Sequence, residues 1–180
     1  MTRLQLEHLI RAAAQIADDD ELIIVGSQAI LGAFPDAPAS LRVSMEADIY
    51  PRNRPERADL IDGTIGEGSP FHETFGYYAQ GVGERTAVLP EEWESRLVPV
   101  CNPNTRGATG QCLDPHDLVL AKLVAGRDKD FRFTRGALRH GLVHASWLED
   151  RVARMPLDET MSELVRARIG RTAREAAVSG

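Results

Sequence analysis

The sequence of 180 residues has only two cysteines, Cys101 and Cys112, which excludes a disulfide-rich scaffold. No group of Cys and His residues has the spacing of a zinc site. No apolar run approaches the roughly 20 residues of a transmembrane helix, and the first residues have the pattern of an amphipathic helix rather than a signal peptide. We therefore expect free thiols, no membrane association and a cytoplasmic location.

The sequence also lacks the positive net charge of proteins that bind long nucleic acids non-specifically. Its 27 acidic and 21 basic residues give a net charge of −6. The charge is uneven, however, because the segments 127–139 and 166–174 are rich in arginine. A local basic face that binds RNA or a nucleotide therefore remains open.

Length and composition predict one globular domain with a small helical appendage. We assign residues 1–145 to the domain and residues 146–180 to a helical C-terminal extension packed on it. Hydrophobic periodicity predicts helices at 4–17, 28–34, 56–65, 70–75, 114–125, 128–142 and 157–177. It predicts strands at 22–25, 41–50, 77–82, 85–89, 97–100 and 111–113. The order indicates an α+β (α/β-like) fold with a small mixed sheet flanked by helices.

The stretch from Leu22 to Pro51 carries the first candidate site. A short aliphatic strand ends at Gly26 and Ser27, where a glycine lets the backbone approach a ligand and the following amides favour an anion. In the next strand, Glu46 and Asp48 lie on one face, roughly 7 Å apart. Two neighbouring carboxylates repel each other unless a proton or a cation lies between them, and Mg²⁺ carrying phosphate oxygens would relieve that repulsion. A plain strand with a solvated polar face is the alternative.

A strand, a Gly-Ser turn, a helix and an acidic pair on the next strand resemble the polymerase-β-type nucleotidyltransferase superfamily. The pair here is Glu46-Ala47-Asp48. The chain departs from the usual pattern in two ways, since its first acid is Glu and the segment between turn and acids is longer. Active members usually have a third carboxylate on a neighbouring strand. The strand expected at 85–89 contains none, so Glu84, Glu92 and Glu94 are the nearest candidates.

The segment DPHDLVLAKLVAGRDKDF, residues 114–131, extends the resemblance to bacterial nucleotidyltransferase-like proteins related to abortive-infection and toxin–antitoxin toxins. Their helix after the sheet carries a lysine, followed by an arginine and a terminal (K/R)-D pair. The matching positions here are Lys122, Arg127, Lys129 and Asp130. Lysine supplies a point charge for a triphosphate, arginine binds phosphate oxygens in a fork, and Asp130 holds either cation in place. Solvated surface cations are the alternative for these residues.

The resemblance implies metal-dependent transfer of a nucleotidyl group from an NTP to a hydroxyl of tRNA, a protein or a small molecule. Glu46 and Asp48 would hold Mg²⁺ or Mn²⁺. Gly26, Ser27, Ser44 and Arg127 would bind the nucleotide, and Lys122 and Asp130 would complete the catalytic set. A toxin of this kind implies an antitoxin protein as partner. Two alternatives stay open: an inactive nucleotide-binding or partner-binding protein on the same fold, and a plain interaction domain that uses the arginine-rich C-terminal helix.

Overall fold

The computed structural model describes residues 1–178, and the chain divides into two compact units. The sheet unit comprises Met1–Thr86 and Leu97–Asp114, and the helical unit comprises Ala87–Arg96 and Pro115–Gly180. The α+β class with a mixed sheet flanked by helices is confirmed. The expected domain boundary after residue 145 stays a prediction.

Among the described residues, five strands form one mixed sheet in the order β3-β2-β1-β5-β4. Their bounds are β1 (Glu21–Ile24), β2 (Glu46–Pro51), β3 (Tyr78–Gly81), β4 (Val98–Val100) and β5 (Thr109–Cys112). The central β1 is antiparallel to β2 and parallel to β5, while β3 is parallel to β2 and β4 is antiparallel to β5. Leu22, Ile23 and Ile24 of β1 are buried, which confirms the predicted aliphatic core strand.

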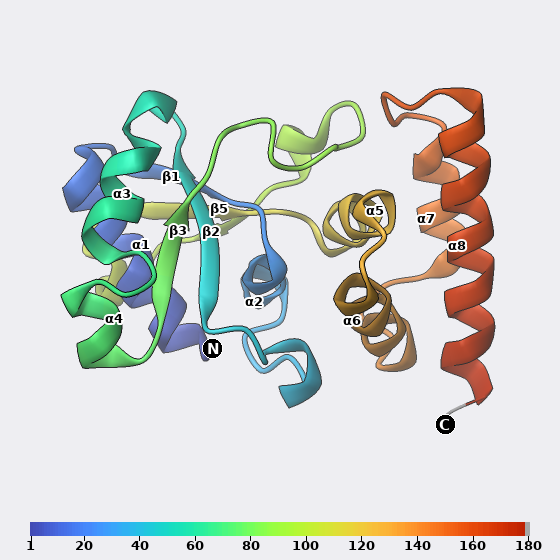
Figure 1. The fold of residues 1–180 in the computed structure, drawn as a ribbon, viewed down its shortest axis with the longest axis horizontal. Helices are drawn as coiled ribbons and strands as arrows, with labels where there is room; N and C mark the ends of the chain where they lie inside the picture. The colour runs from blue at the N-terminus through green and yellow to red at the C-terminus, as the bar shows by residue number, and fades with distance from the viewer. Residues whose placement is uncertain (179–180) are drawn as a thin grey trace. The chain divides into compact units, whose positions relative to one another are not determined.

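The helices of the sheet unit cover both faces of this sheet. Their bounds are α1 (Arg3–Ala17), α2 (Ile30–Ala33), α3 (Ala58–Ile65) and α4 (Pro70–Phe75), with 3₁₀ turns η1 (Ser27–Ala29), η2 (Ala39–Leu41), η3 (Pro55–Arg57) and η5 (Pro103–Thr105). Helices α1, α3 and α4 lie on one side of the sheet, and α2 lies on the other (Figure 1). The helix that follows the Gly-Ser turn therefore occupies a different face from α1.

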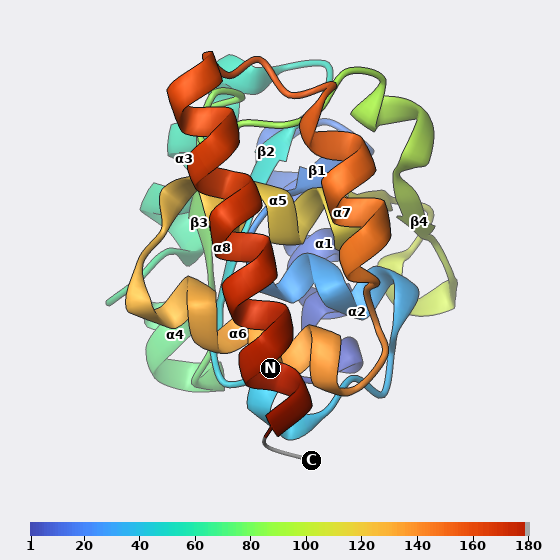
Figure 2. The ribbon, with the colours of Figure 1, turned by 90° about the vertical axis from the view of Figure 1, so that its right-hand side faces the viewer.

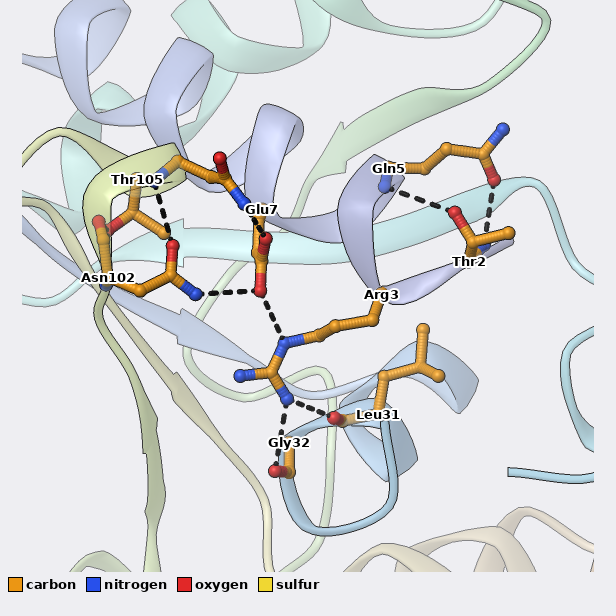
Figure 3. A network of polar contacts seen from close by, with 9 residues as sticks. Thr2, Arg3, Gln5, Glu7, Leu31, Gly32, Asn102 and Thr105 are labelled. Carbon is orange, nitrogen blue, oxygen red and sulfur yellow. Dashed lines mark hydrogen bonds and ion pairs between the residues drawn. The ribbon is translucent and has the colours of Figure 1, made fainter. Parts of the chain in front are cut away.

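The start of α1 ties three segments of the sheet unit together (Figure 3). Thr2 and Gln5 form a capping box, with the Thr2 side chain accepting from the Gln5 amide. The buried Glu7 carboxylate accepts hydrogen bonds from Arg3, Asn102 and Asn104 at 2.9, 2.8 and 2.8 Å. Arg3 also donates to the carbonyls of Leu31 and Gly32, at 2.5 and 3.3 Å. The network thus holds the end of α2, directly after the Gly-Ser turn.

The predicted strand at 41–50 is wrong in its first half, because β2 begins only at Glu46. Residues 39–41 form η2, and Val43 and Met45 are exposed by 75% and 37%. The carbonyls of Arg42 and Ser44 bond to groups outside the sheet rather than to a neighbouring strand. The Ser44 hydroxyl bonds both to the amide and to the carbonyl of Glu46, and the Met1 amino group donates to the carbonyls of Arg42 and Ser44.

The predicted strand at 85–89 is also wrong, because these residues form a turn and a loop. Thr86 donates its amide to the Gly83 carbonyl at 3.0 Å, which closes a turn after β3. Apolar alternation over five residues was too short a signal to distinguish a strand from a loop.

The helical unit contains the 3₁₀ turn η4 (Trp93–Arg96) and the helices α5 (Pro115–Ala125), α6 (Asp128–Arg139), α7 (Ala145–Val152) and α8 (Glu159–Val178). The fully buried Asp117 joins η4, α5 and α7 through ion pairs with Arg96 at 2.8 Å and Arg151 at 2.7 Å. Helix α7 was not predicted. Val165 and Ile169 of α8 are buried, whereas Leu164 is 42% exposed. No helix among residues 1–178 is long and apolar enough to span a membrane.

Candidate functional site

The Gly-Ser turn lies directly against the acidic strand. After β1 ends, the Val25 amide donates to the Asp48 carbonyl at 3.1 Å, and the chain turns at Gly26 into η1. The backbone of Gly26 is extended, at φ −80° and ψ −169°, so its conformation does not require glycine. Glycine is required instead by the lack of space, because a Cβ at Gly26 would lie 1.5 Å from Asp48 Oδ2 and 2.6 Å from its Cγ. The Asp48 carboxylate therefore packs on the Gly26 backbone, next to Ser27.

Glu46 and Asp48 share one face of β2, separated by the buried Ala47. Both side chains are half-buried. On the neighbouring β3, Tyr78 lies opposite Glu46 and Gln80 lies opposite Asp48. The Tyr78 hydroxyl donates to Glu46 Oε2 at 3.2 Å. This pairing orients the first carboxylate of the candidate site.

Negative charge accumulates around Tyr78. Burial, the Glu46 charge and hydrogen bond, and the charges of Glu67 and Asp48 together raise the pKa of Tyr78 to about 12. The phenol therefore stays a neutral hydrogen-bond donor at physiological pH. The sequence did not single out Tyr78 or Glu67, since only the β2–β3 register and the loop before α4 bring them near the acidic pair.

A third carboxylate does not join the pair. No group of three or more His, Cys, Asp or Glu residues among 1–178 is arranged to hold a metal ion. Of the three candidates, Glu84 is exposed in the loop after β3. Glu92 and Glu94 belong to the helical unit, where Glu92 pairs with Arg154 at 3.3 Å. The place beside Asp48 on β3 carries the amide of Gln80.

Glu46 and Asp48 still form a donor set that fits a hard divalent cation. Mg²⁺ usually binds to one or two carboxylates, with waters and substrate phosphates as its other ligands. Gln28 is completely buried, yet neither its Nε2 nor its Oε1 has a hydrogen-bond partner among the described residues. An amide left without partners in the interior costs free energy of folding.

The Ser44 side chain forms hydrogen bonds with the backbone at the start of β2. Its hydroxyl accepts from the Glu46 amide at 3.1 Å and lies 3.3 Å from the Glu46 carbonyl, to which it donates. These local bonds orient the start of β2 at the first acidic residue. Contact between Ser44 and a nucleotide stays a prediction.

Lys122, Arg127 and Asp130 form one cluster in the helical unit. Gly126, with φ +66°, ends α5, and Arg127 and Asp130 form a capping box at the start of α6. The completely buried Asp130 accepts from Arg127 Nε at 2.7 Å and from Lys122 Nζ at 3.2 Å. Burial opposes ionisation of Asp130, but Arg127 and Lys122 outweigh it and hold the pKa of that carboxyl below its usual value.

Burial separates the two lysines of this segment. Lys122 is only 7% exposed and its ammonium lies 4.7 Å from the centre of the Phe133 ring, whereas Lys129 is exposed. Lys122 is therefore not a solvated surface lysine. The Arg127 side chain is 60% exposed and can reach a ligand. The structure brings together Gly26, Ser27, Glu46 and Asp48 in the sheet unit, and Lys122, Arg127 and Asp130 in the helical unit.

A mixed sheet with a Gly-Ser turn packed on an acidic strand is consistent with the nucleotidyltransferase fold. A family model described as "Nucleotidyltransferase of unknown function (DUF6036)" matches residues 4–166, and the chain belongs to this family. No curated protein and no solved structure matches the chain significantly.

Proposed function

We propose that the protein transfers a nucleotidyl group from an NTP to a hydroxyl acceptor in a metal-dependent reaction. The packing of the Asp48 carboxylate on Gly26, with 1.5 Å between its Oδ2 and a hypothetical Cβ, carries the proposal. It joins a phosphate-binding turn and an acidic strand that are 20 residues apart in the sequence. Family membership supports the same reaction class.

The residues of the sheet unit would bind the reacting end of the NTP. Glu46 and Asp48 would hold Mg²⁺ or Mn²⁺, which neutralises phosphate charge and bridges phosphate oxygens when bound. Ser27 would donate to a phosphate oxygen, and Gly26 leaves room for that oxygen beside Asp48. Tyr78 would keep Glu46 in place through its 3.2 Å hydrogen bond.

The cations of the helical unit would act on the leaving phosphates. Nucleotidyl transfer depends on positioning and on electrostatic stabilisation of the transition state. Arg127 would bind phosphate oxygens through its exposed guanidinium, while Asp130 holds both Arg127 and Lys122.

Incubation of the full-length protein with each α-³²P-labelled NTP, Mg²⁺ or Mn²⁺ and a cell extract tests the reaction. We expect one acceptor species to become labelled from the α-phosphate but not from the γ-phosphate, since nucleotidyl transfer releases pyrophosphate. The Glu46→Gln/Asp48→Asn variant should give no label. The labelled species identifies the acceptor: RNA, a protein or a small molecule.

A second function, nucleotide binding without catalysis, is favoured by Gln80 at the position beside Asp48. Metal-dependent NTP binding without any transfer would support it over the first. A protein that binds no NTP would instead be an interaction domain. A toxin role, with an antitoxin as partner, rests on the resemblance alone, and growth arrest on expression that requires Glu46 and Asp48 is its test.

The role of Lys122 is tested against Lys129. If Lys122 stabilises charge that develops in the transition state, Lys122→Ala should lower kcat about a hundredfold or more with little change in KM, a loss of roughly 2.7–4 kcal/mol. Lys129→Ala should change little. Because removing one partner of a buried ion pair costs about 3–5 kcal/mol of stability, the melting temperature of each variant must be followed. Equally small effects on kcat would favour the binding-protein alternative.

A further inference from the structure

The two units carry opposite charge. The sheet unit has 8 basic and 15 acidic residues, a net charge of −7, while the helical unit has 13 basic and 12 acidic residues, a net charge of +1. Seven of the eleven arginines of the helical unit lie on α6 (Arg132, Arg135 and Arg139) and on α8 from residue 166 onward (Arg166, Arg168, Arg171 and Arg174), whereas Glu159 and Glu163 lie nearer the start of α8. The α6–α8 pair therefore has a strongly basic region that the net charge of the protein hides.

One carboxylate serves several arginines where α6 meets α8. Glu175 accepts from Arg135 at 2.6 Å and pairs with Arg171 at 3.5 Å. Hydrogen bonding and charge from Arg135, with the charges of Arg171 and Arg174, lower the pKa of the Glu175 carboxyl. A single negative charge cannot neutralise three guanidinium groups, so an excess of positive charge remains.

Two further arginines of α6 add to this excess of positive charge. Arg132 and Arg139 lie three residues before and four residues after Arg135, on the same side of the helix. Both are exposed, and neither forms an ion pair with any residue of the described chain. Phe131 lies beneath the guanidinium groups of Arg171 and Arg168, at 4.6 and 5.6 Å from its ring centre. The basic face thus contains aromatic as well as cationic groups.

An open groove of about 320 Å³ adjoins this face at Arg139. It is lined by Leu138 and Arg139 of α6, His144 and Ala145 at the start of α7, and Ala173 and Ala176 of α8. Figure 2 shows α8 with α6 on one side and α7 on the other. The His144 ring lies 6.1 Å from the ring of Trp147, which is 54% exposed. Small apolar side chains and His144 therefore line the groove, and the exposed Trp147 lies next to His144.

We propose that the α6–α8 face binds single-stranded nucleic acid. Phosphates contact Arg132, Arg135, Arg139 and Arg171, and a base stacks on Trp147, which lies next to His144 of the groove. Arginines that follow a backbone, together with aromatic rings for unstacked bases, are the combination that proteins use for single strands. The bases of a duplex are stacked on one another and cannot stack on Trp147. An acidic peptide would bind the arginines but has no base to stack on Trp147.

Fluorescence anisotropy of the full-length protein with a labelled single-stranded RNA of about 12 nucleotides tests the proposal without NTP or metal. Failure of this binding is therefore distinct from failure of nucleotidyl transfer. Arg132→Glu/Arg139→Glu should weaken binding at least about tenfold and make the slope of log K against log salt shallower by about 1.4, since each lost phosphate contact contributes roughly 0.7. Trp147→Ala should weaken binding about tenfold with an unchanged slope, because stacking releases no counterions.

Arg85→Glu/Arg106→Glu is the matched control, since both arginines are exposed in the sheet unit and the change in net charge is the same. It should bind RNA like the wild type. Equal weakening by both double variants would overturn the proposal. So would tighter binding of a duplex, or displacement of the RNA by an equally long polyglutamate peptide at similar concentration. Comparable binding of single-stranded DNA would support it, because phosphates and bases are shared.

Discussion

Gly26 shows how one residue without a side chain joins two distant parts of the sequence. Its φ of −80° is open to any residue, so its role is to leave the space that the Asp48 carboxylate occupies. Composition alone marks Gly26 as a turn residue. Only the packing shows that the turn and Asp48 depend on each other.

Gly26→Ala should therefore abolish metal-dependent NTP binding, because the new methyl group displaces the Asp48 carboxylate. Overpacking of this kind also costs about 1–3 kcal/mol of stability. Isothermal titration with Mg²⁺ and NTP measures the first effect, and urea denaturation measures the second.

Gly63→Ala is the control for this change. Gly63 lies inside α3, and a Cβ there meets nothing within 4 Å. The replacement should leave NTP binding unchanged and stabilise the fold by about 0.5–1 kcal/mol. Normal NTP binding by Gly26→Ala would mean that Asp48 takes no part in the site.

At the scale of elements, the buried Glu7 carboxylate of α1 stays ionised although burial favours its neutral form. Burial opposes the ionisation of Glu7, but hydrogen bonds from Asn104, Asn102 and Arg3 outweigh it and place the pKa of Glu7 below its usual value. The ionised Glu7 links α1 to the 102–104 loop and, through Arg3, to α2 (Figure 3). The turn that carries Ser27 is thus supported from a helix near the start of the chain.

Glu7→Gln should destabilise the protein by about 1–3 kcal/mol at neutral pH, because hydrogen bonds to a charged group are lost. Since the folded pKa lies below the unfolded value of about 4.3, the contribution of Glu7 is complete above that value and disappears as the pH falls through the folded pKa. The difference between variant and wild type should therefore shrink in acid. Urea denaturation at a series of pH values measures it.

The exposed Glu84 provides the comparison, and Glu84→Gln should cost little at any pH. A Glu7→Gln penalty that does not change between neutral and acidic pH would mean that the charge of Glu7 contributes nothing.

At the scale of the whole molecule, ligand binding should be visible in the thermal unfolding of the protein. A saturating ligand at a hundred times its Kd stabilises the native state by about 2.7 kcal/mol. For a chain of this size, that corresponds to a rise of roughly 5–10 °C in melting temperature. Differential scanning calorimetry with and without Mg²⁺ and NTP measures the rise.

In Glu46→Gln/Asp48→Asn the rise should disappear, while stability without ligand stays equal or increases, because two neighbouring negative charges are removed. A clear loss of stability without ligand would show that the acidic pair serves the fold rather than a metal.

The sequence by itself determined the elements whose pattern is local. The apolar stripe of α1, the aliphatic run of β1 and the proline at the start of α4 each lie within one element, and all three elements were predicted within a residue or two. The Gly-Ser turn, the acidic pair and the lysine of α5 were also evident, because residue type and spacing carry these signals. Three other segments were predicted wrongly or missed: β2 starts late, 85–89 is a loop, and α7 was not predicted.

Tertiary structure decided what each of these residues touches. The register of β2 and β3 places Tyr78 beside Glu46 and Gln80 beside Asp48, and no local pattern encodes a register between strands 32 residues apart. Burial likewise turns Lys122 into the ion-pair partner of Asp130, because the contact depends on how α5 and α6 pack together. Periodicity is a property of a few consecutive residues, whereas register, close approach and burial arise only when distant segments pack against one another.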